Sequence, residues 1–231
     1  MNIFTKIAKV LFSPSQAIPH LSGADWLLPV LLAVVITFVT TLSMYPSVIL
    51  PMAEQQIDKQ MEKMPSNQRG AMEMAKRQMR SPEAQMFQSL IAGIMQGIGL
   101  LLIALAVMAG GAIAGGKGAK FTAIFPVVCW ASLVGTIETL IRYPIALMKE
   151  SLFVSFSFAA LLDIEALGGP LYTLLNHVNP FSFWWIAIVS AGVSYHYEFG
   201  RRKSIIVLLL LGGLWALTSM LFSLMGASFG G

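Results

Sequence analysis

The run WLLPVLLAVVITFVTTLSMYPSVIL, residues 26–50, decides the fold class because 25 consecutive residues carry no charge. A helix needs about 20 apolar residues to cross the hydrocarbon core of a bilayer, so this run predicts a membrane span. We expect the helix to end at Pro51, because proline lacks the N–H group that continues helical hydrogen bonding. The sequence therefore predicts an all-α membrane protein.

The composition of the whole chain supports this prediction. Of the 231 residues, 56% are hydrophobic and 11% are charged, whereas soluble proteins carry about 25% charged residues. The net charge of +4 is too small and too scattered to indicate nucleic-acid binding. The single cysteine, Cys129, excludes an intramolecular disulfide and any cysteine-based metal centre.

Four further runs bring the predicted spans to five: residues 87–113, 121–144, 181–197 and 204–225. The first of these has a clear start, with Ser81 as N-cap and Pro82 at the first helical position. Residues 181–197 cross only if the helix is nearly upright, and aromatic rings stand near both ends of the run. Residues 151–162 are apolar but too short to cross, which is typical of an interfacial or re-entrant segment.

Two regions lie outside the spans. Residues 1–25 form an N-terminal amphipathic segment, whose apolar stripe fits a helix on the membrane surface or one packed on the bundle. Residues 26–231 form the five-span domain, and within it residues 51–86 form an outer loop of two short amphipathic helices that break near Pro65. We interpret the apolar stripes of this helical hairpin as a partner surface comprising Ile57, Met61, Met64, Met72 and Met79.

Seven of the 14 methionines lie in this loop, and thioethers are ligands for Cu(I). Methionine also packs adaptably on helix faces and binding surfaces. Because neither His nor Cys lies nearby in the sequence, packing or partner contact is the favoured interpretation, and no metal is expected.

Glu138 and Arg142 are four residues apart in the third span, so their side chains can meet on one helix face. Charges inside a span are costly and suggest a functional site by default. Glu138 lies about 25 Å along the helix, however, close to the far membrane boundary. A structural ion pair is the favoured interpretation, and a substrate or proton role is the alternative.

Glycines suggest helix packing rather than nucleotide binding. Gly111, Gly116 and Lys117 have the spacing of a phosphate loop, but Gly118 replaces the Ser or Thr that holds magnesium, so no nucleotide is expected. Two small-xxx-small pairs at the ends of the second span predict close helix contacts, within the chain or with a second copy. Their members are Gly93, Gly97, Gly111 and Gly115. The sequence contains no HExxH, GxSxG or paired-cysteine signature, so no catalytic residue or cofactor is expected.

Three segments, taken in order, resemble the Yip family of Ypt/Rab-interacting membrane proteins, in its prokaryotic branch. They are KVLFSPSQAIPHL (9–21), GGKGAKFTAIFPVVCWASLVG (115–135) and NPFSFWWIAIVSAGVSYHYEFGRRKS (179–204). The resemblance implies five membrane helices, a cytosolic N-terminus and no catalytic residues. Eukaryotic relatives bind Rab GTPases through a long N-terminal region, but about 25 residues precede the first span here, so that activity is not carried over.

The basic residues of the short segments predict the same orientation. With the N-terminus inside, the inner side carries Lys6, Lys9, Lys117, Lys120 and the basic run 201–203. The long first loop counts against this orientation with six basic and five acidic residues, although long loops of mixed charge weigh less.

We therefore expect a multi-pass protein of a bacterial inner membrane, with the N-terminus cytoplasmic and the C-terminus outside. Its expected role is non-enzymatic: it organises membrane lipids or partner proteins, including a membrane-protein partner or a second copy. The alternative is a small-solute or ion transporter or channel that uses Glu138 and Arg142.

Overall fold

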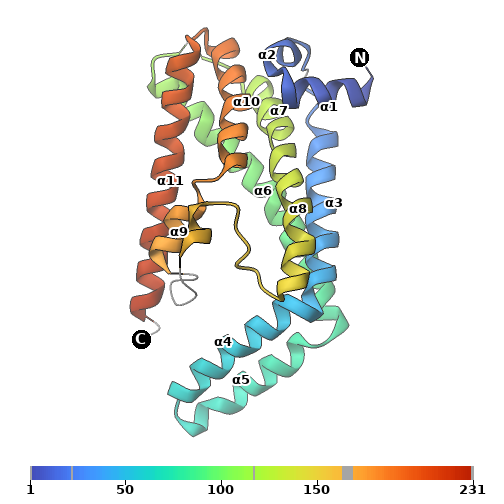
Figure 1. Ribbon diagram of the computed structural model, residues 1–231, viewed down its shortest axis with the longest axis vertical. Coiled ribbons are helices and arrows are strands. Elements are labelled where there is room, and N and C mark those ends of the chain that lie inside the picture. Colours follow the sequence, from blue (N-terminus) through green and yellow to red (C-terminus); the bar gives the residue numbers. More distant parts are fainter. Residues whose placement is uncertain (1, 22, 117, 163–168, 230–231) are drawn as a thin grey trace.

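A computed structural model describes residues 2–21, 23–116, 118–162 and 169–229, and within these ranges the regular structure is entirely helical. Figure 1 shows long helices running side by side, with one short helix lying across one end of the bundle and two helices extending beyond the other end. The first and last described residues lie toward opposite ends of the bundle (Figure 1).

The crosswise helix is α1 (Ile3–Phe12), followed by α2 (Pro14–Ala17) and the 3-10 turn η1 (Ile18–His20). Val10 and Leu11 are buried, and α1 contacts α7 of the bundle. The indole Nε1 of Trp184 donates to the Leu11 carbonyl at 2.9 Å. In contrast, Phe4 and Phe12 are 75% and 76% exposed. The segment therefore packs on the bundle with one face and leaves Phe4 and Phe12 largely exposed.

The first long helix continues further than the sequence predicted. Helix α3 (Leu27–Met44) passes into a π-helical turn, η2 (Tyr45–Ile49), and then directly into α4 (Leu50–Lys63). The expectation that the helix ends at Pro51 was wrong. Pro46 lies at the start of η2 and Pro51 at the start of α4, positions where a missing N–H group costs least, and the wider turn absorbs the lost hydrogen bond.

Helix α5 (Ser66–Met79) follows α4 after a two-residue break, close to the predicted break at Pro65. Lys76 Nζ lies 2.7 Å from Asp58 Oδ1, and Arg80 Nε lies 2.6 Å from Glu54 Oε1, so two ion pairs join the α4 and α5 segments. We call residues 50–80 the α4–α5 pair. It projects past the end of the bundle (Figure 1).

Helix α6 (Pro82–Ile113) starts as predicted, because the Ser81 side chain accepts a hydrogen bond from Ala84 N at 3.1 Å. It packs along α3 and then on α7. The next helical stretch consists of α7 (Phe121–Ala131) and α8 (Leu133–Lys149), which meet at Ser132. Helix α7 forms the centre of the core, and its Trp130 is only 1% exposed.

The chain after α8 is irregular before it becomes helical again. Within the apolar segment 151–162, Val154 is buried against Met44 and Ala146, and the segment includes the 3-10 turn η3 (Phe158–Leu161). Helices α9 (Pro170–Asn176), α10 (Pro180–Tyr197) and α11 (Arg201–Phe229) follow. Ser155 Oγ donates to Asn176 Oδ1 at 2.7 Å, which ties the irregular segment to the end of α9.

Four helical stretches of the described chain are long and apolar enough to cross a membrane: Leu27–Glu62, Pro82–Ile113, Phe121–Lys149 and Arg201–Leu221. Helix α10, the predicted fourth span, is a helix but is not among them. Helix α11 contacts both α9 and α10, so this interrupted pair lies along the path that α11 follows as one helix (Figure 1). The structure thus shows an all-α protein with several helices able to span a membrane.

Candidate functional site

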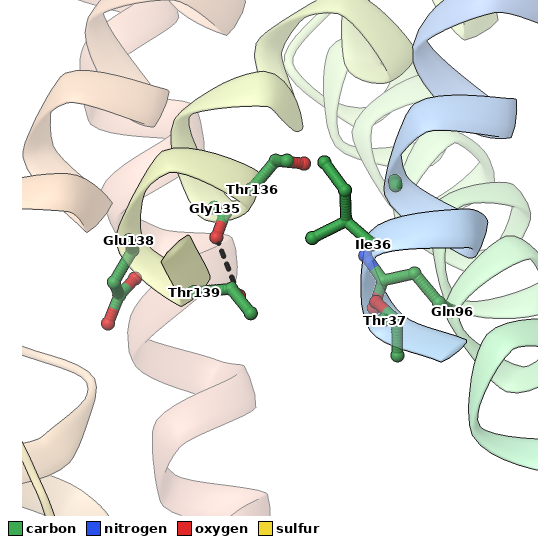
Figure 2. A pocket seen from close by; sticks show the side chains of 8 residues that line it. Ile36, Thr37, Gln96, Gly135, Thr136, Glu138 and Thr139 are labelled. Atoms are coloured by element: carbon green, nitrogen blue, oxygen red, sulfur yellow. Dashed lines mark hydrogen bonds between the residues drawn. The ribbon is translucent and has the colours of Figure 1, made fainter. Parts of the chain in front are cut away.

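A polar cavity of about 240 Å³ lies between α3, α6 and α8, inside the part of the bundle built from candidate spans. Figure 2 shows side chains of α8 on one side and those of α3 and α6 on the other. Four uncharged polar side chains line it: Thr37, Gln96, Thr136 and Thr139. Polar side chains in a membrane span are costly, so their convergence marks a candidate site.

The two threonines of α8 are satisfied by their own helix. Thr139 Oγ1 donates to Gly135 O at 2.9 Å, and Thr136 Oγ1 donates to Ser132 O at 3.3 Å. By contrast, the Thr37 hydroxyl and the Gln96 amide have no side-chain hydrogen bond with any other described residue, so they are available to a polar group that enters the cavity.

Glu138 and Arg142 form the predicted ion pair on α8. The Glu138 side chain is 14% exposed and that of Arg142 is 36% exposed. Although Glu138 borders the cavity, its carboxylate points away from Thr37 and Gln96 (Figure 2). Arg142 Nε is buried without a hydrogen-bond partner among the described residues. Glu138 therefore lines the cavity, while its carboxylate is paired with Arg142 and directed away from Thr37 and Gln96.

Sequence reasoning found the charged pair but missed the uncharged cluster. Gln96 is a single polar residue within an apolar run, and this is the signal that could have drawn attention to it. Thr37 and the α8 threonines carry no such signal, because threonine is common in membrane helices. Their convergence depends on how three helices, far apart in the sequence, pack together.

The predicted partner surface lies on the α4–α5 pair. Its five residues are all half-buried in the structure: Ile57, Met61, Met64, Met72 and Met79. Met79 is also held at the base of the pair, where its carbonyl accepts a hydrogen bond from the Tyr45 hydroxyl at 3.2 Å. Met74, outside the predicted set, is the exposed methionine of α5 at 73%.

The ion pair of Arg80 with Glu54 has an electrostatic consequence. A hydrogen bond from the Arg80 guanidinium is the main cause that holds the pKa of Glu54 below the ordinary value of 4.5; burial opposes it, and the charges of Arg80 and Lys76 support it. The same pair raises the pKa of Arg80. Glu54 therefore stays ionised, and the pair stays formed, to lower pH than for an isolated carboxylate.

The four glycines predicted for helix packing have different surroundings. A Cβ at Gly93 would lie 3.2 Å from Val34 O, and one at Gly97 would lie 3.9 Å from a Val34 methyl group, so both face α3. Gly111 is covered by the Tyr197 ring, 2.5 Å from its Cβ position. Gly115 has another role. Its φ is +77° and no atom lies within 4 Å of its Cβ position, and it forms the turn after α6.

The described residues contain no group of three or more His, Cys, Asp or Glu side chains arranged to hold a metal ion. Binding of Cu(I) by the methionines of the outer loop stays a prediction. Lys117 of the phosphate-loop spelling lies outside the described residues.

The family model for the Yip1 domain matches residues 8–231. The chain belongs to the Yip1 domain family. The predicted membership of the Yip family is thereby confirmed, and the chain is an integral membrane protein of that family with several helices able to span a membrane. Comparison with curated proteins and with solved structures gives no match.

Proposed function

We propose that this Yip1 domain protein is non-enzymatic and organises membrane lipids or partner proteins, with the α4–α5 pair as its recognition surface. The observation that carries the proposal is the projection of this pair beyond the bundle, braced by two ion pairs (Figure 1). A braced pair of 14-residue helices is a rigid surface, so it binds a partner without an ordering cost.

The proposal includes a topology. The N-terminus is cytoplasmic and the C-terminus outside a bacterial inner membrane, with α9 and α10 together making the fifth crossing. The opposite placement of the two chain ends supports an odd number of crossings, and the α4–α5 pair lies at the end away from α1 (Figure 1). A reporter active only outside the cytoplasm is expected to work after Met64 and to fail after Arg202. The reverse pattern would contradict the orientation.

The alternative transport function has less support. Glu138 is engaged by Arg142, and its carboxylate is turned away from the polar cavity (Figure 2). A transport path through the cavity would have to rely on Gln96 and threonine hydroxyls, because the Glu138 carboxylate is paired with Arg142.

Recognition is tested by photo-crosslinking in the native membrane. A photoreactive amino acid replaces Met74, which is exposed, and as the matched control it replaces Leu210, which is 69% exposed on α11 in a candidate span. We expect a discrete protein adduct from position 74 and only diffuse or lipid adducts from position 210.

The adduct must depend on the surface around it. Replacing Met72, one of the half-buried methionines on the same helix, by Asp places an unpaired charge in the predicted partner surface, so the adduct from position 74 should fall at unchanged protein level. An adduct that persists, or that forms equally from position 210, would contradict recognition by the α4–α5 pair.

A further inference from the structure

A second cleft, of about 390 Å³, lies between α3, α6 and α7, toward the end of the bundle that α1 crosses. Its lining is largely apolar and includes Val30 and Leu101. Three aromatic rings form one wall: Trp26 lies 5.5 Å from Phe125, which stacks on Phe121 at 5.0 Å between centroids. The cleft is within the size range of small-molecule sites, about 300–1,000 Å³.

The position of the cleft indicates what fills it. All three helices belong to candidate spans, so the cleft opens among helices that lie in lipid. Leu101 is part of its lining and is 41% exposed, so the cleft reaches the outer surface of the bundle. An apolar cleft on such a surface is the natural place for a lipid acyl chain, because the chain keeps its apolar surroundings and fills space that helix packing leaves open.

A lysine adjoins one of the residues that line the cleft. Lys120 directly precedes Phe121, is exposed, and has no ion pair in the described part of the chain. It is also the N-cap residue of α7 and makes no side-chain cap, so the unsatisfied N–H groups of the first helical turn add positive potential. An anionic group is the complement of this arrangement.

The charges at the same end of the bundle reinforce this complement. Arg201, Arg202 and Lys203 are exposed in the first turn of α11, where cations are unfavourable to the helix dipole. The Asp25 carboxylate is already engaged, with Oδ1 lying 2.5 Å from Lys6 Nζ. Further positive charge therefore lies at the same end of the bundle as the apolar cleft (Figure 1).

We propose that this cleft binds an anionic phospholipid, with an acyl chain against Trp26, Phe121 and Phe125 and the phosphate headgroup at Lys120. The proposal deepens the lipid-organising part of the proposed function and rests on it. The two proposals can be refuted independently. Absence of the position-74 adduct would refute recognition by the α4–α5 pair, and absence of lipid stabilisation would refute lipid binding at the opposite end of the bundle.

The test is a lipid titration of the full-length protein in an uncharged detergent, with the apparent melting temperature as readout. Phosphatidylglycerol is compared with phosphatidylcholine of the same acyl chains, and inorganic phosphate is titrated alone. We expect phosphatidylglycerol to raise the melting temperature most, phosphatidylcholine less and phosphate not at all. Equal effects of the two lipids, or a full effect of phosphate, would overturn the proposal.

Two variants assign the effect to the cleft. Gly97→Leu fills the cleft, because Gly97 lines it and its nearest Cβ contact is 3.9 Å away, so both lipids should lose their effect. Lys120→Gln should lower the affinity for phosphatidylglycerol, taken from the midpoint of the lipid titration, about fivefold. The response to phosphatidylcholine should be unchanged.

Each variant has a matched control. Gly99→Leu makes the same change two residues further along α6. Gly99 does not line the cleft, and no atom lies within 4 Å of its Cβ position. Lys149→Gln removes an exposed positive charge from the last residue of α8, whereas Lys120 precedes the first residue of α7. Both controls should keep the original response, and loss of stabilisation in either would overturn the assignment to the cleft.

A measurement on the otherwise unaltered chain covers the case in which Gly97→Leu does not fold. Phosphatidylglycerol with brominated acyl chains should quench tryptophan fluorescence saturably, and Trp26→Phe should remove the saturable part. Trp215→Phe, which changes an exposed ring on α11, should leave it in place. Saturable quenching that survives Trp26→Phe would show that the chain binds elsewhere.

Discussion

Replacing Arg142 by Gln should destabilise the protein, because the change leaves the Glu138 carboxylate without its partner. Removing one member of a buried ion pair costs about 3–5 kcal/mol, whereas an exposed pair contributes about 0–1 kcal/mol. Glu138 is 14% exposed and Arg142 is 36% exposed, so the pair lies between these limits. We expect a loss of about 2 kcal/mol.

For a chain of this size, such a loss lowers the melting temperature by about 4–8 °C. The assay is thermal unfolding in detergent, and Lys149→Gln serves as the control because it removes an exposed basic residue from the same helix. The control should melt within about 2 °C of the original protein.

Exchanging the two charges, Glu138→Arg with Arg142→Glu, separates a structural pair from a transport site. The four-residue spacing survives the exchange, so a structural pair should regain most of the lost stability, although the reversed order is somewhat weaker on a helix. A folded exchange variant that abolishes a solute flux measurable for the original protein in liposomes would refute the scaffold function. An exchange variant as unstable as Arg142→Gln would refute the energetic reasoning.

Two further predictions follow from local geometry. Gly192→Ala should cost about 1–3 kcal/mol in thermal unfolding, because its Cβ would lie 2.3 Å from a Val127 methyl group, whereas Gly135→Ala, with open space, should be neutral or add about 0.5–1 kcal/mol. The protection of α4 and α5 amides against hydrogen exchange, corrected for the intrinsic exchange rate at each pH, should fall as the pH drops below 4.5. Protonation of Glu54, whose pKa Arg80 lowers, removes their ion pair, so Glu54→Gln should remove the Glu54-dependent part of this loss.

The positions of the long helices along the chain could be predicted where the local sequence signals were strong. The uncharged runs located α3, α6, α7, α8 and α11, and the Ser81 cap with Pro82 located the start of α6 within one residue. Each of these signals depends only on neighbouring residues and on the bilayer thickness, so no knowledge of packing was needed.

The errors arose where tertiary packing decides the local structure. Pro51 should have stopped the first helix, but the π-helical turn Tyr45–Ile49 carries the chain through, and its Tyr45 and Val48 are fully buried. That burial supports a turn which the local sequence disfavours. The contact of the segment 151–162 with the bundle could not be predicted either, because it depends on the packing of Val154 against α3 and α8 residues.

The candidate site shows the same division. Glu138 and Arg142 were predictable as a pair, because one helical turn separates them. The polar cavity was not, because Thr37, Gln96 and Thr139 come from three helices whose mutual rotation is set by close contacts such as Gly93 against Val34. A rotation of one helix would turn Gln96 into lipid without altering any feature of the sequence.

The two ends of the bundle differ in how their charges are used, and this difference connects the two proposals. On the α4–α5 pair, Lys76 and Arg80 form ion pairs with acidic residues of the preceding helix, and these ion pairs hold the two helices together. At the α1 end, Lys120 and the basic first turn of α11 have no such match in the described chain. Unmatched cations at the ends of spans attract an anionic leaflet. Under the two proposals, the α1 end holds an anionic lipid and the α4–α5 pair meets a partner.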